Sequence, residues 1–264
     1  MHFRRYDSRS MQASATLDQR RRVLRAALAS LAALGGSTLL RDARGGVCSS
    51  PESLFGNGFE ASAVGSGSGC VLIPSETQGP YPLLSVLSQP GMQRYDITEG
   101  RAGIPLLLEL RLLNLSNGCQ PIEGAALYLW HCDKDGVYSG YSQPGSNTVG
   151  QTFCRGIQFS DCNGVVRLLT LYPGWYAGRI THLHFQVYLN VAGSVTATSQ
   201  LALPQAVTQA VYASPLYLAR GQNTSVTSFA QDNVFSDGVE RQMLNIEGSV
   251  GGGYLATIDI GVAL

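Results

Sequence analysis

Apolar and polar residues alternate along residues 181–190 with the two-residue period of a β-strand. The alternation runs in the order His182, Leu183, His184, Phe185, Gln186 and Val187. Same-face side chains that are two residues apart on a strand lie about 7 Å from each other, so both imidazoles can reach one metal ion. The pattern predicts a half-buried strand that carries two histidines on one face and an apolar surface on the other.

Short apolar segments separated by glycine and proline turns recur through the rest of the chain, and no helical period is sustained. A brief helix is expected at 204–212, because Pro204 suits a first helical turn. Many short strands favour an all-β fold, an antiparallel β-sandwich. Besides 181–190, the expected strands are 106–113, 125–132, 152–159, 165–172, 195–203, 244–250 and 254–262.

A basic cluster followed by an apolar run lies near the start of the chain. Arg20, Arg21 and Arg22 precede an uncharged run at 26–40 that is rich in alanine and leucine. The run is shorter than the roughly 20 residues of a membrane-spanning helix. The pattern is typical of a secretory signal and resembles the twin-arginine export pattern. We therefore expect a periplasmic or extracellular protein without stable membrane insertion once the signal is removed.

The distribution of residue types along the chain predicts three segments. We expect an export signal at 1–44, a flexible Gly/Ser-rich linker at 45–69 and one folded domain at 70–264. The 18 basic and 18 acidic side chains balance, which argues against a nucleic-acid surface.

Six cysteines in an exported protein make disulfides plausible, although six allow 15 pairings and the sequence does not choose among them. A cysteine-ligated zinc site is disfavoured because no Cys-x-x-Cys pair occurs. The cysteines are Cys48, Cys70, Cys119, Cys132, Cys154 and Cys162.

Two motifs stand out in the middle of the chain. Residues 127–139 read Leu-Tyr-Leu-Trp-His-Cys-Asp-Lys-Asp-Gly-Val-Tyr-Ser, and residues 173–185 read Pro-Gly-Trp-Tyr-Ala-Gly-Arg-Ile-Thr-His-Leu-His-Phe. Together they closely resemble the intradiol ring-cleavage dioxygenases, the catechol and protocatechuate dioxygenases, which carry a non-haem ferric ion on a β-sandwich. The resemblance covers roughly residues 76–203, with several motifs in the family's order.

The resemblance implies a set of site residues. The family's active-site arginine falls on Arg179 and its glutamine on Gln200. Residues 77–81 resemble the family's Gly-Pro-Tyr entry segment near the pocket. The implied metal ligands are Tyr138, Tyr176, His182 and His184.

The chemistry of these residue types agrees with the resemblance. Phenolates are hard anionic donors that suit Fe(III), and neutral imidazoles complete the set. The family implies a catechol-type diol that displaces Tyr176, reaction with O2, and ring opening between the hydroxyl carbons to a muconate-type diacid. Arg179 would stabilise developing negative charge, and Gln200 would orient the same region.

Other interpretations of the same residues remain open at this point. Tyr141 competes with Tyr138 as a ligand, and Tyr172 competes with Tyr176. A zinc or cupin-like site would add His131 to the paired histidines, although no glutamate follows them as in cupins. An exported β-sandwich binding module of the transthyretin-like kind, without catalysis, would also fit the strand spacing.

Overall fold

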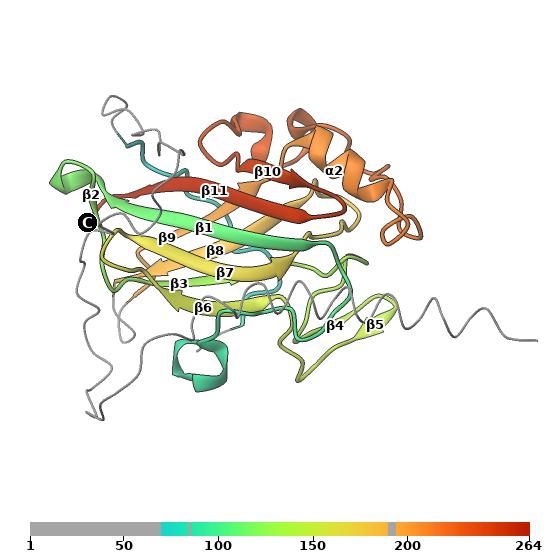
Figure 1. The fold of residues 1–264 in the computed structure, drawn as a ribbon, viewed down its shortest axis with the longest axis horizontal. Coiled ribbons are helices and arrows are strands. Elements are labelled where there is room, and N and C mark those ends of the chain that lie inside the picture. Colours follow the sequence, from blue (N-terminus) through green and yellow to red (C-terminus); the bar gives the residue numbers. More distant parts are fainter. Residues whose placement is uncertain (1–69, 84–85, 190–193) are drawn as a thin grey trace, which may run out of the picture. The chain divides into compact units, whose positions relative to one another are not determined.

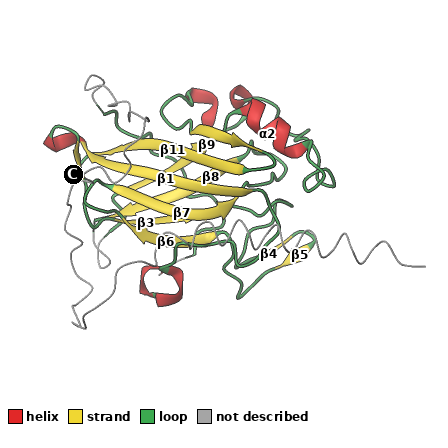
Figure 2. Cartoon of the chain, viewed as in Figure 1, coloured by secondary structure: helices red, strands yellow, loops and turns green. Residues whose placement is uncertain are grey.

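The computed structural model describes residues 70–83, 86–189 and 194–264. The predicted export signal and linker, together with Cys48, lie outside the described residues, so export stays a prediction. Strands make up most of the regular structure (Figure 2). The prediction of an all-β sandwich is confirmed. No helix in the described ranges is long and apolar enough to cross a membrane.

The first sheet is built around β1, which pairs with β2, β7 and β11, and runs in the order β10-β11-β1-β2, with β7 off this path. β1 and β11 are parallel, while β2 and β7 are antiparallel to β1. The prediction was an antiparallel sandwich, but this sheet also contains one parallel pair of strands, β1 with β11. The strands are β1 (Pro105–Asn114), β2 (Gln120–Pro121), β7 (Val165–Leu171), β10 (Asn245–Ser249) and β11 (Gly253–Val262).

The second sheet is fully antiparallel and runs in the order β6-β3-β8-β9. In Figure 1 it lies behind β1, β7 and β11 of the first sheet. Its strands are β3 (Ala126–Trp130), β6 (Arg155–Phe159), β8 (His182–Tyr188) and β9 (Ala197–Ala202).

Short elements complete the fold. The expected helix is present as α2 (Gln205–Tyr212), and β4 (Ser142–Gln143) pairs with β5 (Ser146–Asn147). Five 3-10 helices occur in the described ranges: η1 (Val86–Ser88), η2 (Pro90–Met92), η3 (Leu115–Asn117), η4 (Phe229–Gln231) and η5 (Phe235–Asp237).

The main core fills the space between the sheets. Alternate residues of β1, including Leu106 and Leu108, are fully buried and belong to one apolar cluster with Leu183 and Phe185 of β8. Their removal from water supplies the principal driving force for this packing. The inward face of β8 is thus the apolar face predicted from the alternation.

The outward face of the second sheet is covered as well. Tyr128 and Trp130 of β3 form a second buried cluster with residues before β1, among them Val86 and Met92. As a result, all seven residues of β8 are buried. The prediction of a half-buried strand was wrong, because chain segments distant in sequence cover its polar face.

Cysteines occupy two environments in the described residues. Cys70, the first described residue, and Cys119 form a disulfide, which ties the segment before β1 to the end of the β1–β2 connection. Cys132 and Cys154 are buried free thiols. Cys154 has a φ of 55°, a left-handed conformation that is incompatible with a strand. For this reason β6 begins at Arg155 and not at the predicted residue 152.

Candidate metal centre

The loop that follows β3 presents Tyr138. The Asp133 carboxylate accepts hydrogen bonds from the backbone N–H groups of Asp135 and Val137, each at 3.0 Å, and so shapes the turn before Tyr138. Gln143 then holds the tyrosine backbone, donating to its carbonyl at 2.7 Å and accepting from its N–H at 3.2 Å. Tyr138 is fully buried. Its phenol is therefore fixed in place by its loop.

The loop that follows β7 presents Tyr176, and it packs directly against the first tyrosine loop. Gly174 N–H donates to Asp133 O at 3.0 Å. A Cβ added at Gly174 would lie 2.2 Å from Lys134 O, and one added at Gly136 would lie 2.1 Å from Trp175 O. Only glycine permits this backbone approach at either position. The two glycines thus bring the two tyrosines into one site.

The four predicted donors converge on β8. His182 Nε2 lies 3.1 Å from His184 Nε2, and 3.4 Å from the phenolic oxygens of both Tyr138 and Tyr176. Atoms bound about 2.1 Å from one ion, at angles of about 90–110°, lie roughly 3.0–3.4 Å from one another. The observed separations fit four donors around one metal ion.

A hydrogen bond to His182 and a ring contact to His184 orient the two imidazoles so that their Nε2 atoms are available for a metal. His182 Nδ1 lies 2.6 Å from Ile180 O, and a carbonyl only accepts, so Nδ1 carries the proton and Nε2 is free to bind. The ring of Trp130 stacks on His184 with centroids 5.0 Å apart and planes 5° from parallel. Both rings are therefore held with Nε2 toward the other donors.

Burial controls the charge of the donors. Desolvation, assisted by the Arg179 charge, lowers the pKa of His182 to about 3, and desolvation also lowers the pKa of His184 well below its usual value. Desolvation raises the pKa of Tyr176 to about 12 and that of Tyr138 well above its usual value. The imidazoles are neutral donors, and the phenols need a cation beside them to ionise at neutral pH.

The donor chemistry fits a ferric ion. No group of three or more His, Cys, Asp or Glu side chains within the described part of the chain is placed to hold a metal, so two histidines alone do not complete a site. The phenols of Tyr138 and Tyr176 would supply the two missing donors. Hard phenolate oxygens combined with imidazole nitrogens suit Fe(III).

Arg179 and Gln200 lie beside the donors, as the resemblance implied. The Arg179 guanidinium donates to Gln200 Oε1 at 2.7 Å, and its Nη1 lies 3.4 Å from His182 Nε2. Gln200, in β9, also donates to Thr77 O at 2.9 Å. A fixed positive charge therefore lies at the edge of the donor set, where it can stabilise an anionic ligand.

Solved structures of intradiol ring-cleavage dioxygenases share the fold of this chain. The chain is similar to the intradiol ring-cleavage dioxygenase from Tetranychus urticae, at 27% identity and a TM-score of 0.65, over 74% of this chain and 95% of that one. The resemblance to the intradiol ring-cleavage dioxygenases is confirmed. The chain is an enzyme of the dioxygenase class of oxidoreductases.

A second solved structure shares only the fold. It is the dioxygenase domain of a dioxygenase carbohydrate-binding protein fusion from Streptomyces sp. SirexAA-E, at 22% identity and a TM-score of 0.51, over 74% of this chain and 99% of that one. No family model and no curated protein matches the chain.

The competing tyrosines of the dioxygenase have other partners. The Tyr141 hydroxyl donates to Pro82 O, and the Tyr172 hydroxyl lies 2.7 Å from Thr208 Oγ1. Neither phenol is among the groups that contact His182 Nε2. The geometry favours Tyr138 and Tyr176 over these two rivals.

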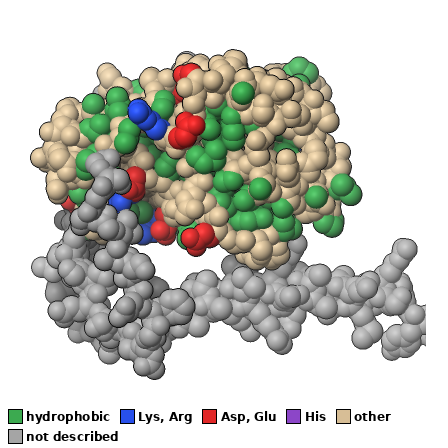
Figure 3. Space-filling view, turned by 90° about the horizontal axis from the view of Figure 1, so that it is seen from above, with side chains coloured by type: hydrophobic (Ala, Val, Ile, Leu, Met, Phe, Trp, Pro, Cys, Tyr) green, Lys and Arg blue, Asp and Glu red, His purple; other side chains and the backbone are tan. Residues whose placement is uncertain are grey.

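His131 also lies apart from the donor set. Its Nδ1 is 2.7 Å from Cys132 O and its Nε2 is 2.7 Å from Thr170 Oγ1, so both ring nitrogens have partners elsewhere. Burial lowers the pKa of His131 to about 4. A zinc or cupin-like site that combines His131 with the paired histidines does not fit this arrangement. The three histidines of the described residues are buried, and none shows on the face in Figure 3.

Asp232 is a site residue that sequence reasoning missed. It is fully buried, and its carboxylate accepts from Arg179 Nε at 2.8 Å and from Ile180 N–H at 2.8 Å. Burial alone would raise its pKa, but these hydrogen bonds outweigh that effect and hold the pKa below its usual value. Asp232 lies in a loop with no recognisable motif, so only the folded structure reveals that it fixes Arg179.

Arg155 is a second residue that the sequence did not single out. It is fully buried at the start of β6, and it donates to Ser139 Oγ at 2.8 Å, Ser139 O at 2.7 Å and the Tyr128 hydroxyl at 2.9 Å. Because Ser139 follows Tyr138 directly, these bonds fasten the tyrosine loop to the sheet. A buried guanidinium satisfied by neutral oxygens thus positions one donor.

The entry segment lies over the donors, as predicted. The ring of Tyr81 stacks on Tyr138 with centroids 4.7 Å apart. Gly79 has a φ of 68°, and a Cβ added there would lie 2.9 Å from His184 Cε1. The segment therefore packs closely enough to limit where His184 can sit.

The Gly79→Ala substitution is expected to disturb the donor set, because the new methyl group pushes His184 away. We expect turnover to fall at least about 10-fold, since small misplacements of reacting groups carry large costs. Gly100→Ala is the matched control, because Gly100 has a φ of 71° but nothing within 4 Å of an added Cβ. Both variants lose about 1 kcal/mol through backbone strain. Equal turnover of the two variants in steady-state assays would contradict the contact.

Proposed function

We propose that this dioxygenase uses Fe(III) to cleave a catechol-type diol between its two hydroxyl carbons, with both atoms of O2 entering a muconate-type diacid. The observation that carries the proposal is the convergence of two phenols and two imidazoles, with phenolic oxygens and His184 Nε2 within 3.4 Å of His182 Nε2. A ferric ion held there would supply Lewis acidity and open positions for the reactants.

The tyrosines differ in a way that suits two roles. Tyr138 is fully buried and held on both sides of its backbone, so it remains in place when a substrate enters. Tyr176 is only partly buried and lies on the loop that leads to exposed Ala177 and Gly178. We propose that Tyr176 gives way to the diol and takes up one of its hydroxyl protons on the phenolic oxygen.

Arg179 and Gln200 would act on the bound diol. The guanidinium is fixed by Asp232, so it presents positive charge without having to reorganise as the diol loses its protons. Gln200 Oε1 accepts from Arg179, and its Nε2 donates to Thr77 O, which orients the arginine toward the donors. Tyr81 would cover the site above Tyr138 and limit the entry of water.

An aerobic substrate screen tests this reaction. We expect at least one compound among catechol, protocatechuate, hydroxyquinol and larger lignin- or tannin-like diols to give a ring-opened diacid whose mass exceeds that of the diol by one O2. With isotopically labelled O2, both new oxygens should carry the label when the product is examined by mass spectrometry. Incorporation of a single labelled atom, or cleavage of any ring bond other than the one that joins the two hydroxyl-bearing carbons, would contradict the proposed reaction.

A further inference from the structure

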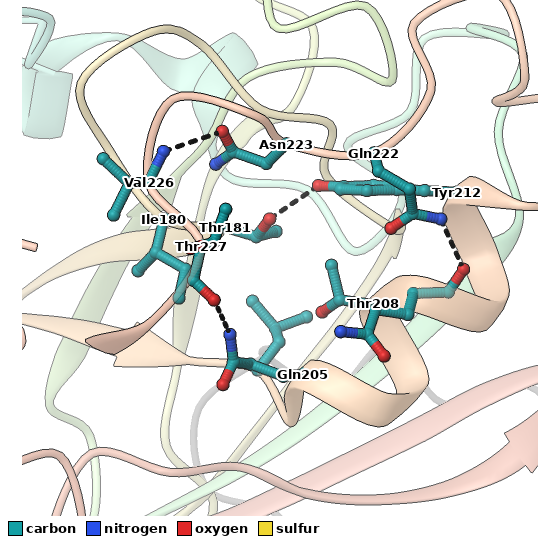
Figure 4. Close-up of a pocket in the computed structure, with 11 residues that line it drawn as sticks. Ile180, Thr181, Gln205, Thr208, Tyr212, Gln222, Asn223, Val226 and Thr227 are labelled. Carbon is teal, nitrogen blue, oxygen red and sulfur yellow. Dashed lines mark hydrogen bonds between the residues drawn. The ribbon is translucent and has the colours of Figure 1, made fainter. Parts of the chain in front are cut away.

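A cavity of about 440 Å³ lies beside α2, and none of the four predicted metal donors lines it (Figure 4). Helix residues, including Gln205 and Thr208, form one wall, and the loop that carries Asn223 and Thr227 forms the facing wall. Ile180 also lines the cavity. The volume lies within the roughly 300–1,000 Å³ of small-molecule sites, so a ligand of modest size can be accommodated.

The lining carries hydrogen-bonding groups but no charge. Its eleven residues comprise four carboxamides, three threonines, one tyrosine and three aliphatic side chains. A charged ligand entering the cavity would lose its hydration without gaining a counter-charge from this lining. A neutral ligand that both donates and accepts hydrogen bonds, and that also presents apolar C–H surface, matches the lining.

Several of these carboxamides keep hydrogen-bonding atoms that are available to a ligand. Gln205 donates through Nε2 to Thr227 O at 2.6 Å, and Gln222 donates through Nε2 to Gln209 O at 2.9 Å, which leaves both side-chain oxygens able to accept. The Gln209 side chain has no hydrogen-bond partner among the described residues. The cavity therefore offers both donors and acceptors.

Internal hydrogen bonds hold the walls in place without a ligand. The Thr181 hydroxyl lies 2.6 Å from that of Tyr212, which donates to Pro173 O at 3.1 Å. Asn223 Nδ2 donates to Arg179 O at 2.8 Å. The cavity is thus preformed, as small-molecule sites usually are. An occupant would contact the short segment between Arg179 and the first histidine donor.

We propose that this cavity binds a neutral, polyhydroxylated molecule of the size of one or two sugar rings. Hydroxyl groups would exchange hydrogen bonds with Gln205, Gln209 and Gln222, while ring C–H groups would lie against Ile180 and Val226. The proposal concerns binding alone and does not depend on the metal or on the proposed reaction.

Saturation-transfer NMR on the full-length protein tests the proposal. Methyl β-D-glucoside and sucrose are the neutral probes, and glucuronate and, at pH 6, glucosamine are charged counterparts that keep the sugar ring. We expect saturable binding of at least one neutral probe, and binding at least tenfold weaker for both charged probes. Absence of saturable binding by both neutral probes, or equal binding of charged and neutral probes, would overturn the proposal.

Two neighbouring substitutions on α2 locate the binding. Gln209 and Ala210 are both exposed, but only Gln209 lines the cavity. Gln209→Trp fills the cavity and should weaken neutral-probe binding at least tenfold, whereas Ala210→Trp should leave it unchanged. Thr227→Trp, on the facing wall, provides the same test if the first variant does not fold. Equal binding by the cavity-filling and control variants would place the ligand elsewhere.

Discussion

Replacing Tyr138 with phenylalanine lowers turnover by at least about 100-fold, if the phenol is one of four donors to the iron. Loss of a residue that only orients a metal ligand typically costs 10–100-fold in metal affinity or activity. Loss of the metal ligand itself is expected to cost at least as much. The fully buried ring keeps its packing, because only the hydroxyl is removed. Steady-state turnover with the preferred diol, and the visible spectrum of the iron-loaded variant, measure the effect.

Tyr141→Phe is the control for this experiment. Tyr141 lies three residues away in the same loop, and its hydroxyl bonds to Pro82 O and not to the donor set. We expect this variant to keep its visible band and most of its turnover. If Tyr138→Phe keeps an unchanged band, or if Tyr141→Phe loses it, the assignment of Tyr138 as a donor is wrong.

The second large effect is expected at Asp232. The Asp232→Ala substitution leaves the Arg179 guanidinium buried without its carboxylate, and breaking such a pair costs about 3–5 kcal/mol of folding free energy. The exposed side-chain fractions of Arg179 and Asp232 are 10% and 0%, so water cannot replace the lost partner. Urea unfolding measures the change, and turnover should fall as well because Arg179 loses its orientation.

An exposed ion pair supplies the matched comparison. Arg111 and Asp259 bond at 2.8 Å through Nε, but their side chains are 42% and 51% exposed. Asp259→Ala should therefore cost no more than about 1 kcal/mol. A similar loss of unfolding free energy in both variants would show that Asp232 is not the buried anchor described above.

Much of the fold could be read from local patterns. Apolar segments of strand length predicted β1, β3, β7, β8 and β9 to within a few residues, because each buries at least one face in the core. Pro204 marked the start of α2 for a similarly local reason. The parallel pairing of β1 with β11 was not predictable, because it joins segments about 150 residues apart through backbone hydrogen bonds that leave no side-chain pattern.

The proposed donor set could be predicted from the sequence, but the residues that support it could not. Motif spacing led to Tyr138, Tyr176 and the paired histidines. Asp232 and Arg155 act through contacts with residues distant in the chain, so no periodicity marks them.

The glycines of the two tyrosine loops indicated turns in the sequence but not the contact between the loops. Gly136 and Gly174 suggest turns in the sequence, but the contact that requires them is the approach of two backbones in the folded protein. The covered polar face of β8 has the same origin, since the covering segments come from distant parts of the chain.

The central claim is that two phenols and two imidazoles share one ferric ion. Metal analysis combined with visible absorption of the purified wild-type protein tests it most directly. One iron per chain and a broad visible band from phenolate-to-iron charge transfer are the results expected. A colourless protein that retains full diol-cleaving activity, or one whose stoichiometric metal is zinc, would contradict the claim.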